Sequence, residues 1–195
     1  MNIFKTAFLV TLLTSVIAAC GGGGTSSSSS TNVSKVLAVG DSIGNGYGGV
    51  SAWPDLVRAR TGYNVVNYSQ GGRHAAYSVS TVRFAIDREQ PSHLIIMLGT
   101  NDSNRGSVSG ATSAMQQIVE YARARNVVPI VGTVPPRNSK SRQISANYRA
   151  IGAPIADIEA AFGSGSGLFQ ADGVHPNNAG QDVIANTFIS ALKAN

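Results

Sequence analysis

The sequence is short of cysteine, histidine and charge. It has one cysteine and three histidines among 195 residues, and charged residues make up 13%. A single cysteine excludes disulfides within the chain and cysteine-rich metal clusters, and three histidines leave little for a histidine-based metal site. We therefore expect no metal, and chemistry that depends on oxygen nucleophiles and an imidazole.

Runs of basic residues are absent as well. The chain has 15 Lys and Arg against 10 Asp and Glu, a formal net charge of +5, but the basic residues are scattered singly. This distribution lacks the basic patch that tracks phosphates, so nucleic acid is not an expected partner. Hydrophobic residues make up 43%, which is enough for a core, and the length suits one ordinary domain.

The first 19 residues are typical of an export signal. Lys5 precedes an uncharged stretch, Thr6 to Ala19, which is shorter than the roughly 20 apolar residues of a membrane-spanning helix. The segment Ile17-Ala18-Ala19-Cys20 resembles the lipobox of bacterial lipoproteins, which implies cleavage before Cys20 and lipidation of that residue. The alternative is a free cysteine beside an ordinary signal-peptidase site.

Residues 20–34 follow as a tether. They are nearly all glycine, serine and threonine, and the random-coil spread of residues 21–34 is on the order of 20 Å. We expect an exported domain, residues 35–195, held at the cell envelope by its lipid. Gly21 after the cysteine resembles a sorting signal for the outer membrane if the host has two membranes.

From Lys35 onward, short apolar runs alternate with helical patterns, which predicts a three-layer α/β/α, doubly wound sheet of about five parallel strands. The expected strands are Val36–Val39, Val65–Tyr68, His93–Leu98, Val127–Val134 and Pro154–Ile158. The expected helices are Ala52–Arg60, Tyr77–Arg88, Gly110–Arg125 and Asn178–Lys193.

Polar residues follow the expected strands where functional groups gather in open α/β sheets. Gly40-Asp41-Ser42 follows the first strand, Ser69-Gln70-Gly71-Gly72 the second and Gly99-Thr100-Asn101-Asp102 the third. Asp172-Gly173-Val174-His175-Pro176 precedes the last helix. The sequence therefore predicts that a serine, glycine and asparagine amides, an aspartate and a histidine meet at one edge of the sheet.

This set of groups suits acyl transfer. A serine hydroxyl is a weak nucleophile that needs a base and donors for the oxyanion that forms. Pro176 disfavours helix at His175, so Asp172 can curl back to one imidazole nitrogen while His175 acts as the base. The expected oxyanion donors are the backbone amides of Ser42 and Gly72 and the side-chain amide of Asn101.

These four blocks, in this order, resemble those of the SGNH (GDSL-type) hydrolase family, and most of all its small esterase, thioesterase and lysophospholipase members. The resemblance implies the flavodoxin-like fold of that family, with Ser42 as nucleophile and donor and Gly72 and Asn101 as further donors. It also implies His175 as base and Asp172 as its orienter. Two departures from the family pattern are Ile43 in place of a common Leu, and Arg73-His74 in place of an acidic residue and a threonine.

The same residues admit other interpretations. Gly40 to Gly44 matches the G-x-S-x-G elbow of α/β-hydrolases, but that fold has several strands before its elbow. Gly44 to Gly49 matches G-x-G-x-x-G, but the glycines start beyond the strand end and no acidic residue ends the second strand. An acyltransferase would share the acyl-serine intermediate, and a catalytically silent lipoprotein could bind a glycan or partner.

Several single residues have structural interpretations as well as functional ones. Asp41 and Asp102 are expected to accept hydrogen bonds within their loops, and His93 to pack in a strand. His74 is left open between catalysis, the wall of a pocket and the surface. Aromatic residues that either line an acyl or alcohol pocket or belong to the core are Tyr47, Trp53 and Tyr77.

The sequence thus predicts a monomeric, lipid-anchored serine esterase without metal or organic cofactor. Its expected substrates are small-molecule, glycan or lipid esters. The segments between the blocks are short and leave no obvious lid, which indicates a shallow site and short acyl groups. Arg73 and His74 offer a positive edge for an anionic substrate.

Overall fold

A computed structural model describes residues 32–195, and the predicted lipidation site Cys20 and most of the predicted tether lie outside them. The chain forms one five-stranded sheet with the order β2-β1-β3-β4-β5, in which each neighbouring pair is parallel. The strands are β1 (Lys35–Gly40), β2 (Asn64–Asn67), β3 (His93–Met97), β4 (Val128–Gly132) and β5 (Ile155–Ala156). This is the flavodoxin-like order, so the predicted fold class is confirmed.

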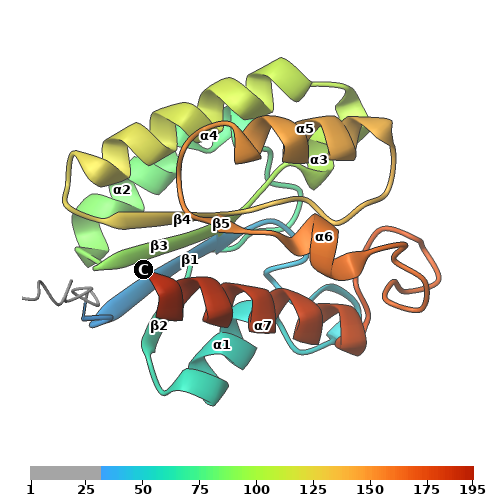
Figure 1. Cartoon of the computed structure of the whole chain (residues 1–195), viewed down its shortest axis with the longest axis horizontal. Helices are drawn as coiled ribbons and strands as arrows, with labels where there is room; N and C mark the ends of the chain where they lie inside the picture. Colours follow the sequence, from blue (N-terminus) through green and yellow to red (C-terminus); the bar gives the residue numbers. More distant parts are fainter. Residues whose placement is uncertain (1–31) are drawn as a thin grey trace, which may run out of the picture.

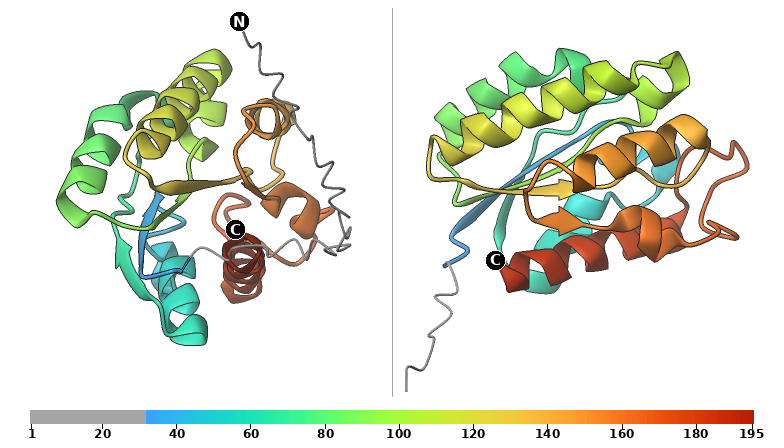
Figure 2. Two further views of the ribbon diagram at one scale, coloured as in Figure 1. Left: turned by 60° about the vertical axis from the view of Figure 1, so that its left-hand side comes forward. Right: turned by 45° about the horizontal axis from the view of Figure 1, so that its top comes forward.

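The central strands are buried on both faces, as a continuous apolar run predicts. Alternate residues of β1 and β3 enter different cores, because side chains along a strand point to opposite faces. Leu37, Val39, Leu94 and Ile96 belong to one buried cluster, whereas the second contains Val36, Ala38, Ile95 and Met97. The sheet is therefore the middle of three layers (Figures 1 and 2).

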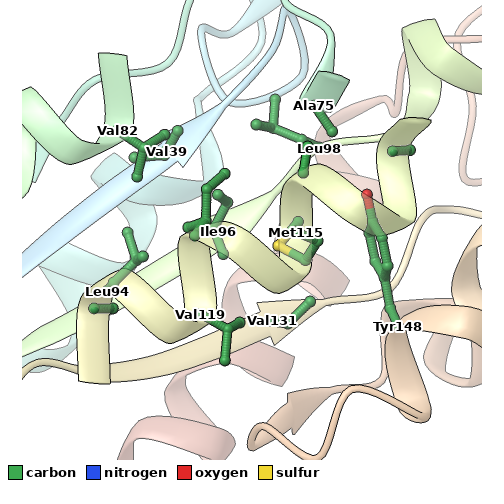
Figure 3. Packing of buried hydrophobic residues seen from close by; sticks show 14 of the residues in the cluster. Val39, Ala75, Val82, Leu94, Ile96, Leu98, Met115, Val119, Val131 and Tyr148 are labelled. Atoms are coloured by element: carbon green, nitrogen blue, oxygen red, sulfur yellow. The ribbon is translucent and has the colours of Figure 1, made fainter. Parts of the chain in front are cut away.

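One layer consists of α2 (Val79–Glu89), α4 (Val108–Arg123) and α5 (Ser139–Arg149), with the short α3 (Thr100–Arg105) at its end. Helix α4 buries Met115, Ile118 and Val119 against the strands. Figure 3 shows Met115 among strand residues such as Ile96 and Val131. Met115, Ile118, Val119 and Ala122 recur at helical spacing and form this buried face, within the helix expected over Gly110–Arg125.

The opposite layer consists of α1 (Trp53–Thr61), α6 (Ile158–Phe162) and α7 (Asn178–Ala194). Trp53 is fully buried and stacks on Phe188 of α7, with ring centroids 4.6 Å apart. Trp53 is therefore a core residue and does not line a substrate pocket. Two short 3-10 turns, η1 (Tyr47–Gly49) and η2 (Ala75–Tyr77), complete the elements.

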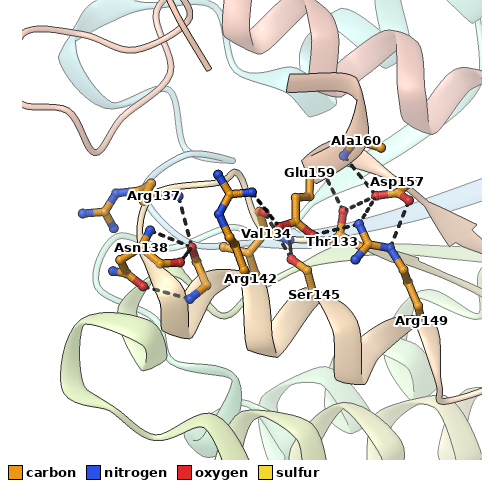
Figure 4. Close-up of polar contacts among 11 residues, drawn as sticks. Thr133, Val134, Arg137, Asn138, Arg142, Ser145, Arg149, Asp157, Glu159 and Ala160 are labelled. Carbon is orange, nitrogen blue, oxygen red and sulfur yellow. Dashed lines mark hydrogen bonds and ion pairs between the residues drawn. The ribbon is translucent and has the colours of Figure 1, made fainter. Parts of the chain in front are cut away.

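Helix α5 is the long helix that the sequence patterns did not locate. Its buried positions, Ser141, Ile144, Ser145 and Tyr148, have helical spacing, but two of the four are serines and weaken the apolar signal. Those serines are used in hydrogen bonds: Ser145 Oγ accepts from the Val134 amide at 3.0 Å, and Ser141 closes a capping box with Asn138. Figure 4 shows this network, which fixes the segment after β4.

The expected boundaries differ from the observed ones mainly at the weaker elements. Strand β5 is two residues long where Pro154–Ile158 was expected, and Tyr77 belongs to η2 because α2 begins at Val79. No helix among residues 32–195 has the length and apolar character needed to cross a membrane. Strands β1 and β3 are neighbours, and the strand order reverses between them. Open α/β sheets bind ligands at the carboxyl ends of the strands that flank such a reversal.

Candidate active site

Ser42 lies in the turn that directly follows β1. The carboxylate of Asp41 accepts the Ile43 backbone N–H at 2.9 Å, which fixes this turn. Asp41 is buried, and that burial raises its pKa to about 6. Asp41 thus holds the turn as a structural acceptor, while the half-buried Ser42 directs its hydroxyl to another part of the chain.

His175 and Asp172 share a tight loop before α7. Asp172 Oδ1 accepts the backbone N–H groups of Val174 at 2.8 Å and of His175 at 2.9 Å, and Asp172 Oδ2 lies 2.7 Å from His175 Nδ1. These bonds, led by the backbone N–H of His175, lower the pKa of Asp172 to about 2. The carboxylate therefore stays ionised beside the imidazole at neutral pH.

The imidazole joins this loop to Ser42. Its Nε2 lies 2.9 Å from Ser42 Oγ, and its other nitrogen faces the carboxylate of Asp172. An ionised carboxylate only accepts hydrogen bonds, so Nδ1 carries a proton and Nε2 of the neutral ring is left to accept from the serine hydroxyl. The three side chains that the sequence singled out are within hydrogen-bonding distance in the order that general-base activation of a serine requires.

Tyr47 covers one face of the imidazole. Its ring stacks on that of His175 with centroids 3.9 Å apart and planes inclined by 21°. Gln170 holds this arrangement, because its Nε2 donates to Tyr47 O at 2.9 Å and to Pro176 O at 3.1 Å. Of the two interpretations left open for Tyr47, the structure favours the site over the core, because the side chain is 54% exposed and stacks on His175. The contact made by Gln170 had no signal in the sequence.

The two expected oxyanion donors besides Ser42 are Gly72 and Asn101. Asn101, in the first turn of α3, donates through Nδ2 to Arg73 O at 2.9 Å and lies 3.5 Å from Asp41 Oδ2. Gly72 occupies an exposed turn with φ of 72°, a backbone conformation that favours glycine. Asn101 is thus hydrogen-bonded to the residue that directly follows Gly72.

A glycine also permits the sharp exit from β3 that places Asn101. Gly99 has φ of 126°, and a Cβ there would lie 2.8 Å from Val134 and 3.3 Å from the buried hydroxyl of Tyr148. A larger residue would push α3 away from the sheet. The third block therefore needs glycine at this position for steric reasons.

Asp102 anchors the segment after Gly72. It is fully buried and accepts the backbone N–H groups of Ala75 at 2.8 Å and Ala76 at 3.2 Å, which agrees with its expected structural part. His74 Nδ1 lies 3.9 Å from Asp102 Oδ2, and the His74 side chain is 11% exposed. Of the three interpretations left open for His74, the structure favours the wall of a pocket over the surface.

That pocket is a depression of about 250 Å³ beside Gly72. Its lining is mostly polar and includes Gln70, Arg73, His74 and Tyr77, with Tyr77 77% exposed. Arg73 donates to Tyr68 O and to Gln70 Oε1, each at 2.8 Å, so both outer nitrogens of its guanidinium are already engaged. His93 lies far from this edge, buried at the start of β3.

Residues 32–195 contain no group of three His, Cys, Asp or Glu side chains arranged to hold a metal ion. The glycines of residues 44–49 lie in a loop that includes the turn η1 and do not open a helix, since α1 begins at Trp53. The dinucleotide interpretation of these glycines is therefore wrong.

The sequence reasoning missed Arg137, which lies in the segment after β4. Its Nε donates to Gly173 O at 3.2 Å and its Nη1 to Asn104 Oδ1 at 3.0 Å. The only sequence signal available was its position after a buried strand, the same signal that identified the other blocks.

Comparisons with known proteins agree with this geometry. Residues 38–183 match the model of the GDSL-like lipase/acylhydrolase family. The matched region includes Ser42, Asn101 and His175.

Similar proteins are hydrolases by name. The chain is 32% identical over 178 residues to "Esterase TesA" of Pseudomonas aeruginosa, covering 81% of this chain and 87% of that protein. It is 25% identical over 173 residues to "Thioesterase 1/protease 1/lysophospholipase L1" of Escherichia coli K12, covering 81% and 83%. A crystal structure of TesA superimposes with a TM-score of 0.73 at 26% identity, covering 82% of this chain and 98% of that one. These names favour hydrolysis over the acyl-transfer and binding-protein alternatives.

Proposed function

The chain belongs to the GDSL-like lipase/acylhydrolase family, and from that membership we propose that it hydrolyses carboxylic esters through an acyl intermediate on Ser42. The observation that carries the proposal is the chain of short contacts from Ser42 Oγ through His175 to Asp172, at 2.9 and 2.7 Å. A serine, a base and a group that orients the base form the minimum set for this chemistry.

In the first half-reaction, Ser42 Oγ attacks the ester carbonyl carbon while its proton passes to His175 Nε2. The imidazolium that forms is stabilised by the carboxylate of Asp172, which stays ionised. The tetrahedral oxyanion accepts hydrogen bonds from the backbone amides of Ser42 and Gly72 and from Asn101 Nδ2. When this intermediate collapses, the bond to the alcohol oxygen breaks and His175 returns the proton to the leaving alcohol.

The second half-reaction uses water in place of the alcohol. His175 Nε2 takes a proton from a water molecule, whose oxygen attacks the acyl carbon on Ser42. The second oxyanion collapses with transfer of the proton back to Ser42 Oγ, which releases the carboxylic acid. The free enzyme is restored, and no external oxidant or cofactor enters the balance.

The depression next to Gly72 supports small acyl or alcohol groups. Its lining is mostly polar, so it offers little apolar area to stabilise a long alkyl chain. We therefore expect acetyl and other short acyl esters to be turned over faster than long-chain ones.

Ser42→Ala tests the mechanism directly. We expect ester turnover to fall by about 10⁴-fold or more, because the acyl intermediate can no longer form. The measurement is steady-state hydrolysis of 4-nitrophenyl esters of increasing chain length by the full chain, with circular dichroism as the control for folding. A folded variant with near-wild-type turnover would remove Ser42 as the nucleophile.

We also propose that the domain is exported and lipid-anchored at Cys20. The domain begins at Lys35, the first residue of β1, whereas Ser42 comes two residues after Gly40, the last residue of the same strand. Six residues of strand, roughly 20 Å, thus separate the entry point from the site. Figure 1 shows β1 crossing the domain in this way, so the point of attachment and the site lie at opposite ends of this strand.

Cys20→Ser tests the anchor. We expect this variant to lose its lipid and to leave the membrane fraction in cell fractionation without detergent, while its ester turnover remains. The wild-type chain in the same fractionation is the control. A variant that stays with the membrane and needs detergent for release would contradict lipidation at this residue.

A further inference from the structure

Arg137 is held firmly at the carboxyl edge of the sheet. Its backbone N–H donates to Ser141 Oγ at 3.1 Å, in the same network that caps α5 through Asn138. Figure 4 shows Arg137 at one end of this network. The backbone that carries this side chain is therefore fixed by hydrogen bonds, although it lies outside regular structure.

The guanidinium of Arg137 lies between two elements of the proposed site. Its Nε donates to the carbonyl of Gly173, in the loop between Asp172 and His175, and its Nη1 donates to Asn104 Oδ1. Asn104 comes three residues after Asn101 on α3, so the two side chains share one face of that helix. A substrate that reaches beyond Asn101 along this face would meet Arg137.

Arg137 forms no ion pair with a carboxylate in the described part of the chain. Among residues 32–195, no Asp or Glu oxygen lies within 4.0 Å of its guanidinium nitrogens. The nearby Asp172 is already engaged by His175 and by backbone amides. Burial lowers the pKa of Arg137, and the charges of Asp172 and Asp41 act against this shift, so the side chain remains a cation.

Neighbouring side chains strengthen the positive potential. Lys140 Nζ lies 2.8 Å from the position that a Cβ on Gly106 would take, at the end of α3, and Arg105 is the residue before that glycine. Neither Lys140 nor Arg105 forms an ion pair within the described part of the chain. Lys140 and Arg105 therefore add positive charge near Arg137 that no ion pair offsets, whereas Arg137 itself also feels the charges of Asp172 and Asp41 through space.

Arg137 differs from Arg73, the arginine that the sequence suggested for this purpose. Both outer nitrogens of Arg73 are bound to Tyr68 O and Gln70 Oε1. Arg137 Nη2 donates no hydrogen bond to residues 32–195, and Nη1 uses one of its two N–H groups. Two adjacent nitrogens with N–H groups to spare form the fork that binds a carboxylate or phosphate.

We propose that Arg137 is a specificity-determining residue that binds an anionic group, a carboxylate or a phosphate, on the ester substrate. The proposal rests on the proposed esterase function and adds a charge requirement to it. The anionic group is located on the part of the substrate that extends past Asn101 toward Asn104 and Gly173.

The test compares esters of similar shape and different charge. On the alcohol part, 4-acetoxybenzoate and 4-acetoxyphenyl phosphate are compared with neutral 4-acetoxybenzamide. On the acyl part, the mono-4-nitrophenyl ester of adipate is compared with its methyl ester. We expect kcat/KM to favour at least one anionic ester over its neutral partner by about tenfold or more. This preference should weaken at high salt while neutral turnover stays unchanged.

Three variants assign the preference to its residue. Arg137→Met should lower kcat/KM for the anionic ester by about tenfold more than for its neutral partner, which abolishes the preference, and Arg137→Lys should keep part of it because the charge remains. Arg123→Met is the matched control. Arg123 also donates to a backbone carbonyl, that of Gly152, and has no carboxylate partner in the described chain, but it lies at the end of α4 away from the site.

Two results would overturn the proposal. One is a wild-type protein that shows no preference in any pair; the other is an equal fall for anionic and neutral esters in Arg137→Met, which would mean that Arg137 only holds the loop of His175. Arg137→Lys and the salt dependence keep the test decisive if Arg137→Met does not fold. Failure of the esterase proposal is distinguishable, because neutral turnover would then not depend on Ser42.

Discussion

Two depressions of about 250 Å³ each lie at opposite ends of the strands, one at the amino edge of the sheet and one at its carboxyl edge. The one at the amino edge is lined by Asp87, Pro91 and Arg125 among others, near the starts of β3 and β4. Its charges are paired within the chain: Asp87 accepts from Arg125 Nε at 3.0 Å and from the Tyr121 hydroxyl at 2.5 Å. Arg125 also stacks over the ring of Tyr121 at 4.5 Å.

The carboxyl edge uses the same types of side chain differently. Arg137 bonds only to a backbone carbonyl and an amide oxygen among the described residues, and Ser42 faces an imidazole instead of a main-chain acceptor. Cavity size therefore does not distinguish the two edges. The carboxyl edge is the candidate site because it brings Ser42, His175 and Asp172 within hydrogen-bonding distance of one another and leaves N–H groups of Arg137 unused.

Asn101→Ala should lower turnover strongly, whereas a matched change at the amino edge should not. It removes a proposed oxyanion donor at the carboxyl edge, and loss of one such donor typically lowers kcat by about 10² to 10³-fold. The measurement is kcat for 4-nitrophenyl acetate, and the matched control is Asn64→Ala, an exposed asparagine at the amino edge. If Asn101→Ala lowers kcat no more than Asn64→Ala does, the Asn101 amide is not an oxyanion donor.

Buried and exposed aspartates at the two edges should give opposite pH dependence of stability. Burial raises the pKa of Asp41 from 3.8 to about 6, so its protonated form favours folding. That contribution is complete below about pH 4 and is lost as the pH rises through 6, at most about 3 kcal/mol of unfolding free energy. The hydrogen bond from Tyr121 lowers the pKa of Asp87, so its contribution is present above pH 4 and is lost as the pH falls.

The measurement is urea unfolding between pH 4 and 7 for the wild type, Asp41→Asn and Asp87→Asn. Asp41→Asn should flatten the decline in unfolding free energy over this range, whereas Asp87→Asn should remove only stability that is present at the upper end. A decline in Asp41→Asn as steep as that of the wild type would show that Asp41 does not titrate over this range in the folded protein.

Local patterns predicted most of the sheet and the residues of the proposed site. The buried strands stand out as apolar runs, and parallel strands bring their following residues to one edge whatever the intervening sequence is. Asp172 and His175 are three residues apart, so one turn of chain suffices to join them.

Contacts between distant segments could not be predicted in this way. Helix α5 buries two serines whose value depends on partners outside the helix, such as the Val134 amide. Arg137 meets Gly173 across 36 positions, and Gln170 meets Tyr47 across 123. Hydropathy and spacing describe neighbouring residues only, so these long-range pairs become visible only in the folded structure.

The stack of Tyr47 on His175 gives the smallest expected effect at the carboxyl edge. An aromatic pair contributes roughly 0.5 to 1.5 kcal/mol, so Tyr47→Ala should lower kcat by about two- to tenfold through a less firmly oriented imidazole. Tyr47→Phe keeps the ring and should stay near wild type. Phe84→Ala removes another exposed aromatic side chain, on α2, and is the control. Because the stack acts on the base, the change should appear in kcat for acetate esters with KM unaltered; an effect confined to KM would instead make Tyr47 a substrate contact.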